Sequence, residues 1–322
     1  MPRDMSVGNE RERTARREEA VPHAPTGGRE VVRRPRALRR TFWKTRALRL
    51  VPPGERGPAA PAAADAPPPG GAGRALGAPC WLSLVTRDIR AAEEFYGRVL
   101  GWCHVPLLGS AGRARSLVLK GGEPVGTISE TAGDLGGYAS WMPYFLVHDV
   151  DTAVARLRER GATVAVGPLT TGAGRVAVVA GPEDAVFGVR QKAPDLRWSV
   201  GRAPTARLEL HTRDIFAAAL FYGGVLGWAG DPETSCDVEY VNDRIAVLDG
   251  PRRVAALRGG TAPGSGGRHR WHTSFRVADV DAAAAAALDR GGRVITPPYG
   301  PPSRREAVLC DREGIPFTVV AT

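Results

Sequence analysis

The chain repeats itself, and this self-similarity constrains its fold more than any other feature. Thr86–Trp102 reads TRDIRAAEEFYGRVLGW, and Thr212–Trp228 reads TRDIFAAALFYGGVLGW, with 13 of 17 positions identical at a separation of 126 residues. A second pair of segments, Phe145–Pro168 and Phe275–Pro298, matches at a separation of 130 residues. A unit of about 115 residues is too long for a solenoid repeat, so the chain contains a duplicated domain.

Each repeat has a succession of strand and helix patterns that predicts an α+β fold. In the first repeat, alternation over 81–85 predicts a half-buried strand, and Asp88 and Gly101 are suited to begin and end a helix. The same succession restarts with a strand at 143–147 and a helix at 151–160. Further strands are expected at 115–120, 123–129, 163–166, 175–180 and 185–190. Each repeat is therefore predicted to contain two successive βαβββ modules. Tyr96 and Tyr222, at helical spacing with neighbouring phenylalanines, are expected in the core.

Positive charge is concentrated at the N-terminus. The chain carries a formal charge of +10, but residues 1–75 alone hold 16 Arg and Lys against 8 Asp and Glu. This Arg-rich, then Pro/Ala/Gly-rich segment is predicted to be a disordered tail, either a solvated extension or a contact for an anionic partner. The remainder is nearly neutral, which disfavours nucleic-acid binding by the folded part. We place domain 1 at 78–192, a linker at 193–203 and domain 2 at 204–322.

The cellular setting follows from the cysteines and from hydropathy. The four cysteines show no CxxC pair or zinc-finger spacing, so free thiols in a reducing cytoplasm are expected. The sequence has no apolar stretch of 18 residues and no apolar signal-peptide core, which predicts a cytoplasmic protein that neither enters nor crosses a membrane.

The recurring landmarks resemble a known superfamily. The FYG–x–VLGW helix, the FxVxDVD restart and the closing strands GPEDAVFGV and DREGIPFTV occur twice in the same order. They are similar to the vicinal-oxygen-chelate superfamily of glyoxalases, bleomycin resistance proteins and dioxygenases, in particular its tandem-domain actinobacterial type. The resemblance implies sheets curved around a cavity. It also implies, in members that do metal chemistry, His, Glu or Gln ligands on the first, fifth and last strands of a domain.

Most of the ligand positions implied by this resemblance hold residues that do not bind a metal ion. In domain 1 they fall on Trp81, Met142 and Gly188, none of which ligates a hard cation. In domain 2 they fall on Arg207, His272 and Thr318, of which His272 alone is a good ligand. We therefore expect no cofactor in domain 1, and leave open a divalent metal in domain 2.

Domain 2 carries the candidate chemistry. Strand alternation places Glu209 and His211 on one face with Arg207, so Glu209, His211 and His272 are candidate metal ligands or catalytic residues. A carboxylate beside His211 would raise the pKa of this histidine and suit it to acid–base work. The alternative is a structural charge cluster in which Arg207 pairs with Glu209. The Gly-rich segment 259–267 is a candidate lid.

The sequence leaves two functions open. In the first, the chain binds a small molecule without metal, using Trp81, Ser83, Met142 and Tyr144 in domain 1, and Arg207 and Thr318 in domain 2. In the second, domain 2 is a lyase, isomerase or dioxygenase/hydroxylase-type enzyme. The two domains are expected to pair within the chain as a pseudo-dimer, which is compatible with a monomer or a homodimer.

Overall fold

The computed structural model describes residues 75–107, 114–131, 140–171, 174–191, 206–231 and 233–322. The predicted tail at 1–75, apart from its last residue, and the predicted linker at 193–203 lie outside this part of the chain. Within the described residues, no helix is long and apolar enough to cross a membrane. The four cysteines all lie in this part and are free thiols.

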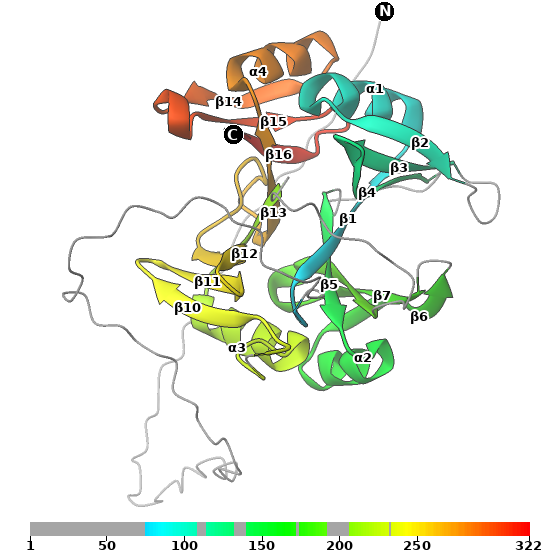
Figure 1. Ribbon diagram of the computed structural model, residues 1–322, viewed down its shortest axis with the longest axis vertical. Helices are drawn as coiled ribbons and strands as arrows, with labels where there is room; N and C mark the ends of the chain where they lie inside the picture. The colour runs from blue at the N-terminus through cyan, green and yellow to red at the C-terminus, as the bar shows by residue number, and fades with distance from the viewer. Residues whose placement is uncertain (1–74, 108–113, 132–139, 172–173, 192–205, 232) are drawn as a thin grey trace, which may run out of the picture. The chain divides into compact units, whose positions relative to one another are not determined.

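Each repeat folds as two successive βαβββ modules, as the sequence predicts (Figure 1). The elements of repeat 1 are β1 (Pro79–Thr86), α1 (Ile89–Leu100), β2 (Cys103–Leu107), β3 (Arg115–Lys120), β4 (Glu123–Glu130), β5 (Met142–Val147), α2 (Val150–Glu159), β6 (Thr163–Thr171), β7 (Gly174–Ala180), the 3₁₀ turn η3 (Pro182–Asp184) and β8 (Val186–Gln191). The elements of repeat 2 are β9 (Ala206–Thr212), α3 (Ile215–Leu226), β10 (Asp237–Val241), β11 (Arg244–Asp249), β12 (Arg252–Gly259), β13 (Arg270–Val277), α4 (Val280–Asp289), β14 (Arg293–Tyr299), the 3₁₀ turn η4 (Pro302–Arg304), β15 (Glu306–Cys310) and β16 (Pro316–Ala321).

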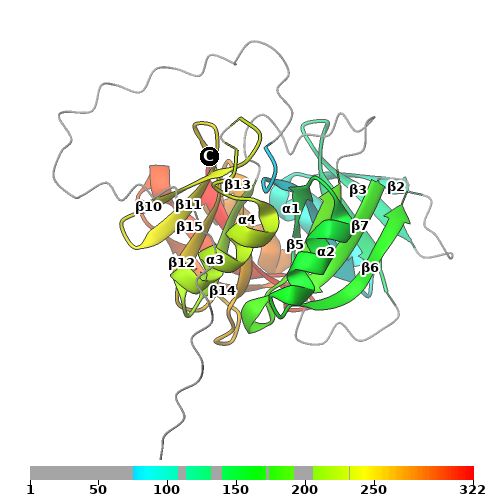
Figure 2. The same cartoon turned by 90° about the horizontal axis from the view of Figure 1, so that it is seen from below.

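The eight strands of each repeat form one mixed, curved sheet. Repeat 1 has the order β2-β3-β4-β1-β5-β8-β7-β6, and repeat 2 has the matching order β10-β11-β12-β9-β13-β16-β15-β14. The two modules of a repeat meet where their first strands pair antiparallel, β1 with β5 and β9 with β13. In each module the first strand also pairs parallel with the last. Figure 2 shows the curvature of the strands across β5, β7 and β6.

Local sequence signals fix where the helices begin and end. An aspartate precedes each of the four helices and accepts a hydrogen bond from the backbone N–H three residues later, as Asp88 does from Ala91 at 3.0 Å. Such a bond satisfies a donor that the first helical turn leaves free. Gly101 ends α1 in the left-handed conformation, with a φ of 67°, which glycine adopts without the steric cost of a Cβ atom.

The helices of the two repeats pack against one another, α1 with α4 and α2 with α3 (Figure 1). Aromatic side chains continue this contact into one shared core. Tyr96 is fully buried as predicted, and Trp102 meets Phe275 of the other repeat edge-to-face at 4.9 Å between ring centroids. The counterpart in the other half is the contact of Trp228 with Phe145, with ring centroids 6.3 Å apart, and Phe187 meets Tyr222 at 5.1 Å. The repeats therefore stabilise each other by burying apolar surface that neither could cover alone.

Polar contacts link the repeats at two matching places, each at one copy of the Thr-Arg-Asp motif. Glu313 of repeat 2 accepts hydrogen bonds from Thr86 Oγ1 at 2.9 Å and from the backbone N–H of Arg87 at 2.8 Å. Its counterpart Glu183 of repeat 1 accepts from the backbone N–H of Arg213 at 3.1 Å. Each repeat thus uses a glutamate from its last turn to hold the loop before the other repeat's first helix.

Candidate functional site

Each sheet has one face packed against the helices and one open face, the face opposite the helices. In repeat 1 the open face of the central strands carries the four residues that the sequence singled out for ligand binding. Trp81 pairs directly with Tyr144, and Ser83 with Met142, across β1 and β5. All four are partly exposed, whereas the intervening Leu82 is in the core. The structure therefore brings these side chains to one surface.

The open face of repeat 1 has an aromatic ring where the superfamily resemblance implies a metal ligand. Gly188 lies opposite Tyr144 in the parallel pair of β5 and β8. A Cβ atom on residue 188 would lie 2.1 Å from Cδ1 of Tyr144, so the tyrosine ring occupies the space of any side chain there. Burial raises the pKa of Tyr144 to about 12, so its hydroxyl stays protonated at neutral pH.

Two arginines complete this face, and sequence reasoning did not single out either. The guanidinium carbon of Arg190 lies 5.5 Å from the ring centroid of Trp81, a cation–π arrangement. Arg115 and Arg190 both act electrostatically on Tyr144, lowering its pKa against the larger effect of burial. Trp81 Nε1 donates to Thr127 Oγ1 at 3.1 Å, which fixes the indole. Arg190 follows Gly188 by two residues on β8, so strand alternation alone would have placed it on this face.

The open face of repeat 2 is polar. Glu209 of β9 pairs with His272 of β13, and Arg207 with Ser274, which also pairs with Thr318 of β16. The candidate residues of domain 2 therefore do share one face, but Arg207 is exposed and Thr318 buried.

His272 is held by the strand beside it. Its Nε2 lies 2.7 Å from Thr318 Oγ1, and the side chain is buried. Burial, together with the nearby His211 and Arg270, lowers the pKa of His272 to about 3. The imidazole is therefore neutral at physiological pH, and the nitrogen facing Thr318 is engaged in a hydrogen bond.

Glu209 and His211 differ from the sequence expectation in two respects. The alternative in which Arg207 pairs with Glu209 is wrong, because Arg244 Nη1 donates to Glu209 Oε1 at 3.3 Å. The pKa of His211 is lowered, where the sequence led us to expect a raised value. Burial outweighs the opposing effect of Glu209, whose Oε2 lies 3.9 Å from His211 Nε2. Among the described residues, His211 Nε2 is a buried nitrogen with no hydrogen-bond partner.

The donor groups on the two open faces do not fit the superfamily's metal site. Within the part of the chain that the structure describes, no group of three or more His, Cys, Asp or Glu residues is arranged to hold a metal ion. The rings of His211 and His272 are 6.1 Å apart between centroids and perpendicular. Glu209 is bonded to Arg244, and Arg207 would place a permanent positive charge beside a cation.

This architecture, two sheets each built from paired βαβββ modules, defines a class of protein that comparison with known families identifies. Residues 80–190 match the family model described as the glyoxalase/bleomycin resistance protein/dioxygenase superfamily, and residues 207–320 match a glyoxalase-like domain. The chain belongs to this superfamily, as a tandem-domain member.

Relatives align with this chain across both domains. The chain is 29% identical over 266 residues to the anthracycline biosynthesis protein DauV of Streptomyces sp. (strain C5), an alignment that covers 76% of this chain and 94% of the relative. It is 30% identical over 260 residues to the putative glyoxylase CFP32 of Mycobacterium tuberculosis, with the same coverage.

Solved structures share the fold at low sequence identity. The Mn(II)-bound glyoxalase from Novosphingobium aromaticivorans superposes with a TM-score of 0.50 at 16% identity, covering 77% of this chain and 83% of the other. The 2,3-dioxygenase LapB from Pseudomonas sp. KL28 gives 0.51 at 13% identity, covering 77% and 93%. These similarities confirm the predicted fold of two curved sheets.

Proposed function

We propose that the protein binds a small organic molecule with a planar ring system and a negatively charged substituent on the open face of repeat 1, without a bound metal. The observation that carries this proposal is the arrangement of Arg190 over Trp81 beside the Tyr144 ring. Aromatic carbon suits stacking on a flat ligand, and a guanidinium fork suits a carboxylate or an ionised phenol.

The residues have distinct roles in this proposal. Trp81 and Tyr144 supply aromatic surface, and Met142 adds an adaptable apolar contact. Arg190 and Arg115 supply the positive charge, and Ser83 offers a hydroxyl to a polar edge of the ligand. The relatives that are named anthracycline biosynthesis proteins support a ligand with fused planar rings.

Isothermal titration calorimetry with a planar probe in two charge states tests this proposal. We expect 9,10-anthraquinone-2-carboxylate to bind more tightly than the uncharged 2-(hydroxymethyl)anthraquinone. Replacing Arg190 with Gln is expected to weaken binding of the carboxylate about tenfold or more, since a hydrogen bond to a charged group contributes about 1.5–3 kcal/mol. The control is Arg90→Gln, an exposed position on α1 at the helical side of the sheet, which should leave binding unchanged. Equal affinity for both probes, or equal weakening by both variants, would refute the assignment.

The metal-free part of the proposal has its own measurement. Protein purified without chelator is analysed for bound metal, and titrated with Mn²⁺ and Zn²⁺ while its melting temperature is followed. We expect substoichiometric metal and no saturable stabilisation. Stoichiometric metal that is lost on replacing His272 with Ala would overturn this part and leave the aromatic site of repeat 1 untouched.

A second candidate function rests on His211. Its Nε2 is buried, has no hydrogen-bond partner among the described residues and lies near the Glu209 carboxylate. A general base needs such a nitrogen, able to accept a proton from a substrate. The lowered pKa keeps the imidazole neutral and able to accept a proton. A proton-transfer reaction of lyase or isomerase type would use His211 as base and Glu209 to stabilise the imidazolium.

Deuterium exchange tests the second candidate without a known substrate. Dihydroxyacetone is incubated with the protein in D2O, and exchange of its carbon-bound protons is followed by NMR. Exchange that His211→Gln abolishes, Glu209→Gln slows and Arg190→Gln leaves unchanged supports a base on the open face of repeat 2. Exchange no faster than in buffer, or unchanged in His211→Gln, counts against it.

A further inference from the structure

The solvent-facing side of α3 is apolar. Phe216 is 55% exposed and Leu220 71% exposed, and the two lie one helical turn apart on the same face. Tyr240 of the edge strand β10 is 41% exposed and stacks on Phe216, with 5.9 Å between the ring centroids (Figure 1). Single exposed apolar side chains are common on protein surfaces, whereas a contiguous group of large ones is typical of an interaction surface. We call Phe216, Leu220 and Tyr240 the α3 patch.

The duplicated helix of repeat 1 shows that the fold does not require these apolar residues. At a separation of 126 residues, α1 has Arg90 where α3 has Phe216. It has Glu94 where α3 has Leu220, and both charged residues of α1 are exposed. The two helices otherwise share the FYG–x–VLG sequence, an aspartate N-cap and a glycine C-cap. The α3 patch therefore indicates a contact that α3 makes and α1 does not.

The change at Leu220 also leaves an arginine without an acidic partner. In the contact between α1 and α4, Arg290 Nη1 lies 3.9 Å from Glu94 Oε2. The counterpart of Arg290 in the contact between α2 and α3 is Arg160, which follows the end of α2. Its guanidinium lies against α3, where a Cβ atom on Gly224 would be 2.5 Å from Nη2. Among the described residues Arg160 forms no ion pair, since Leu220 stands where α1 has Glu94.

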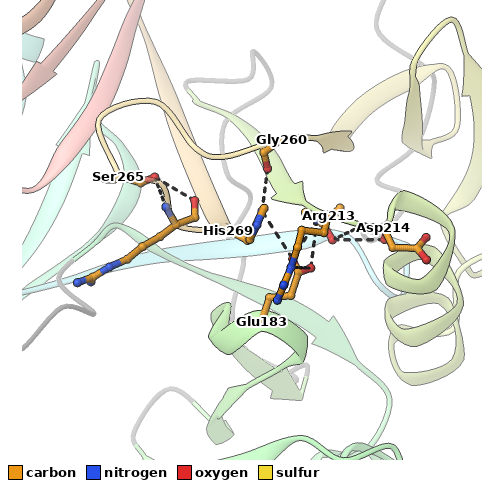
Figure 3. A network of polar contacts seen from close by, with 8 residues as sticks. Glu183, Arg213, Asp214, Gly260, Ser265 and His269 are labelled. Carbon is orange, nitrogen blue, oxygen red and sulfur yellow. Dashed lines mark hydrogen bonds and ion pairs between the residues drawn. The ribbon is translucent and has the colours of Figure 1, made fainter.

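The opposite end of α3 carries negative charge. Asp214 precedes the helix, and its Oδ1 accepts from the backbone N–H of Ala217 at 2.9 Å. The adjacent Arg213 does not neutralise it, because the Arg213 side chain is turned toward Glu183, with Nε 3.1 Å from Oε1 (Figure 3). Asp214 is exposed and, in the part of the chain that the structure describes, belongs to no ion pair. The α3 patch is thus flanked by a carboxylate at one end and a guanidinium at the other.

We propose that the α3 patch is the contact between two copies of this chain, related by a two-fold axis that passes near Leu220. In such a pair the two α3 helices run antiparallel, and each patch meets its own copy. Leu220 lies midway between Asp214 and Leu226, the last residue of α3. The arrangement therefore brings Asp214 of each copy toward Arg160 of the other, so opposite charges meet at both ends. A segment of one sign of charge, such as the Arg-rich N-terminal part of this chain, would match one end alone.

The proposed contact is independent of ligand binding on the open faces. The α3 patch lies on the helical side of the repeat 2 sheet, since Tyr240 stacks on a residue of α3. One helix and one edge strand form an interface at the small end of those that are specific. We therefore expect a dissociation constant in the micromolar range.

Sedimentation velocity of the full chain, from about 1 to 100 µM, measures this association. Leu220→Glu places on α3 the residue that α1 has, and offers Arg160 a partner within its own chain. We expect it to weaken dimerisation at least tenfold without lowering the melting temperature. The matched control is Leu288→Glu, the same change at a leucine of α4 that is 57% exposed, which should alter dimerisation less than twofold. Arg160→Gln should weaken dimerisation about two- to fivefold, as expected for the loss of exposed ion pairs.

Hydroxyl-radical footprinting of the unmodified chain at the same two limiting concentrations identifies what covers the α3 patch. We expect its three side chains to be oxidised at about 1 µM and protected at about 100 µM. Protection at both concentrations would assign the patch to another segment of the same chain, and protection at neither would leave it to a different partner. Either result overturns the proposal. So does a dimer that Leu220→Glu and Leu288→Glu weaken equally, while a dimer unchanged by Arg160→Gln contradicts the antiparallel arrangement.

Discussion

Tyr96 of the first helix donates a buried hydrogen bond of 3.0 Å to Asp311, which lies in the last turn of the other repeat. Asp311 Oδ1 also accepts from the backbone N–H groups of Glu313 and Ile315, both at 2.9 Å. The contact therefore joins the helix of repeat 1 to the turn that presents Glu313 to Arg87. The matching bond cannot form in the other half, because Tyr222 corresponds to Tyr96 but residue 181, which corresponds to Asp311, is a glycine and has no carboxylate.

The first prediction concerns pH and Asp311. Burial raises the pKa of Asp311 from 3.8 to about 6, so the folded protein keeps this proton over a range where the unfolded chain has lost it. The free energy of unfolding should therefore fall as pH rises from about 4 to about 6, by up to about 3 kcal/mol from this group. Asp311→Asn should remove that component of the slope in urea unfolding measured across this range. Asp289→Asn, an exposed site at the end of α4, should keep it.

The second prediction concerns His272 and has the opposite sign. Its pKa is depressed to about 3 in the folded protein, below the ordinary 6.5, so protonation favours the unfolded chain. The stability from neutral His272 is fully present above pH 6.5 and is lost as pH falls toward 3. We expect the NMR shifts of the His272 ring protons to stay constant from pH 8 to pH 5, and His272→Gln to flatten the acid limb of the unfolding curve. A ring that titrates near pH 6.5 would contradict the burial described here.

Much of this architecture was predictable because its signals are local. The aspartate and glycine that delimit α1 act within one helical turn, and strand alternation is enough to put Trp81 and Ser83 on one face. The partners of charged groups were not predictable, because they are set by tertiary contacts between distant segments. Glu209 meets Arg244 from a strand two positions away in the sheet, where the nearby Arg207 was the obvious candidate.

The sign of the pKa shift of His211 and the contact between Glu183 and Arg213 were missed for the same reason. A carboxylate two residues away in sequence raises a histidine's pKa only if burial does not dominate, and burial is a property of the folded sheet. Glu183 and Arg213 belong to different repeats and are brought together only when the repeats pack.

The third prediction concerns Gly188 and the Tyr144 ring. Because a Cβ atom at residue 188 would lie 2.1 Å from the ring, Gly188→Ala should displace the tyrosine and destabilise the protein by about 1–3 kcal/mol. Chemical unfolding measures this cost. Tyr144→Ala removes the obstructing ring, so the double variant should be less unstable than the sum of the two single variants. Additive effects would mean that the ring does not occupy this space.

The last prediction compares the two glutamates that link the repeats. Glu313 accepts from Thr86 and from the backbone of Arg87, whereas Glu183 accepts from both the backbone and the guanidinium of Arg213. Because either loss leaves a backbone N–H without its charged acceptor, Glu313→Ala and Glu183→Ala should each cost about 1–3 kcal/mol in urea unfolding.

The costs of these two substitutions should differ in their dependence on salt. The cost of Glu183→Ala should shrink as NaCl is raised from 0.05 to about 1 M, since its ion pair with the largely exposed Arg213 is screened. The cost of Glu313→Ala should change less, because in the described part of the chain Glu313 contacts the backbone N–H of Arg87 and forms no ion pair with its guanidinium. Equal salt dependence would show that the guanidinium of Arg213 adds nothing to the link, and that the backbone contacts alone hold the two repeats at both junctions.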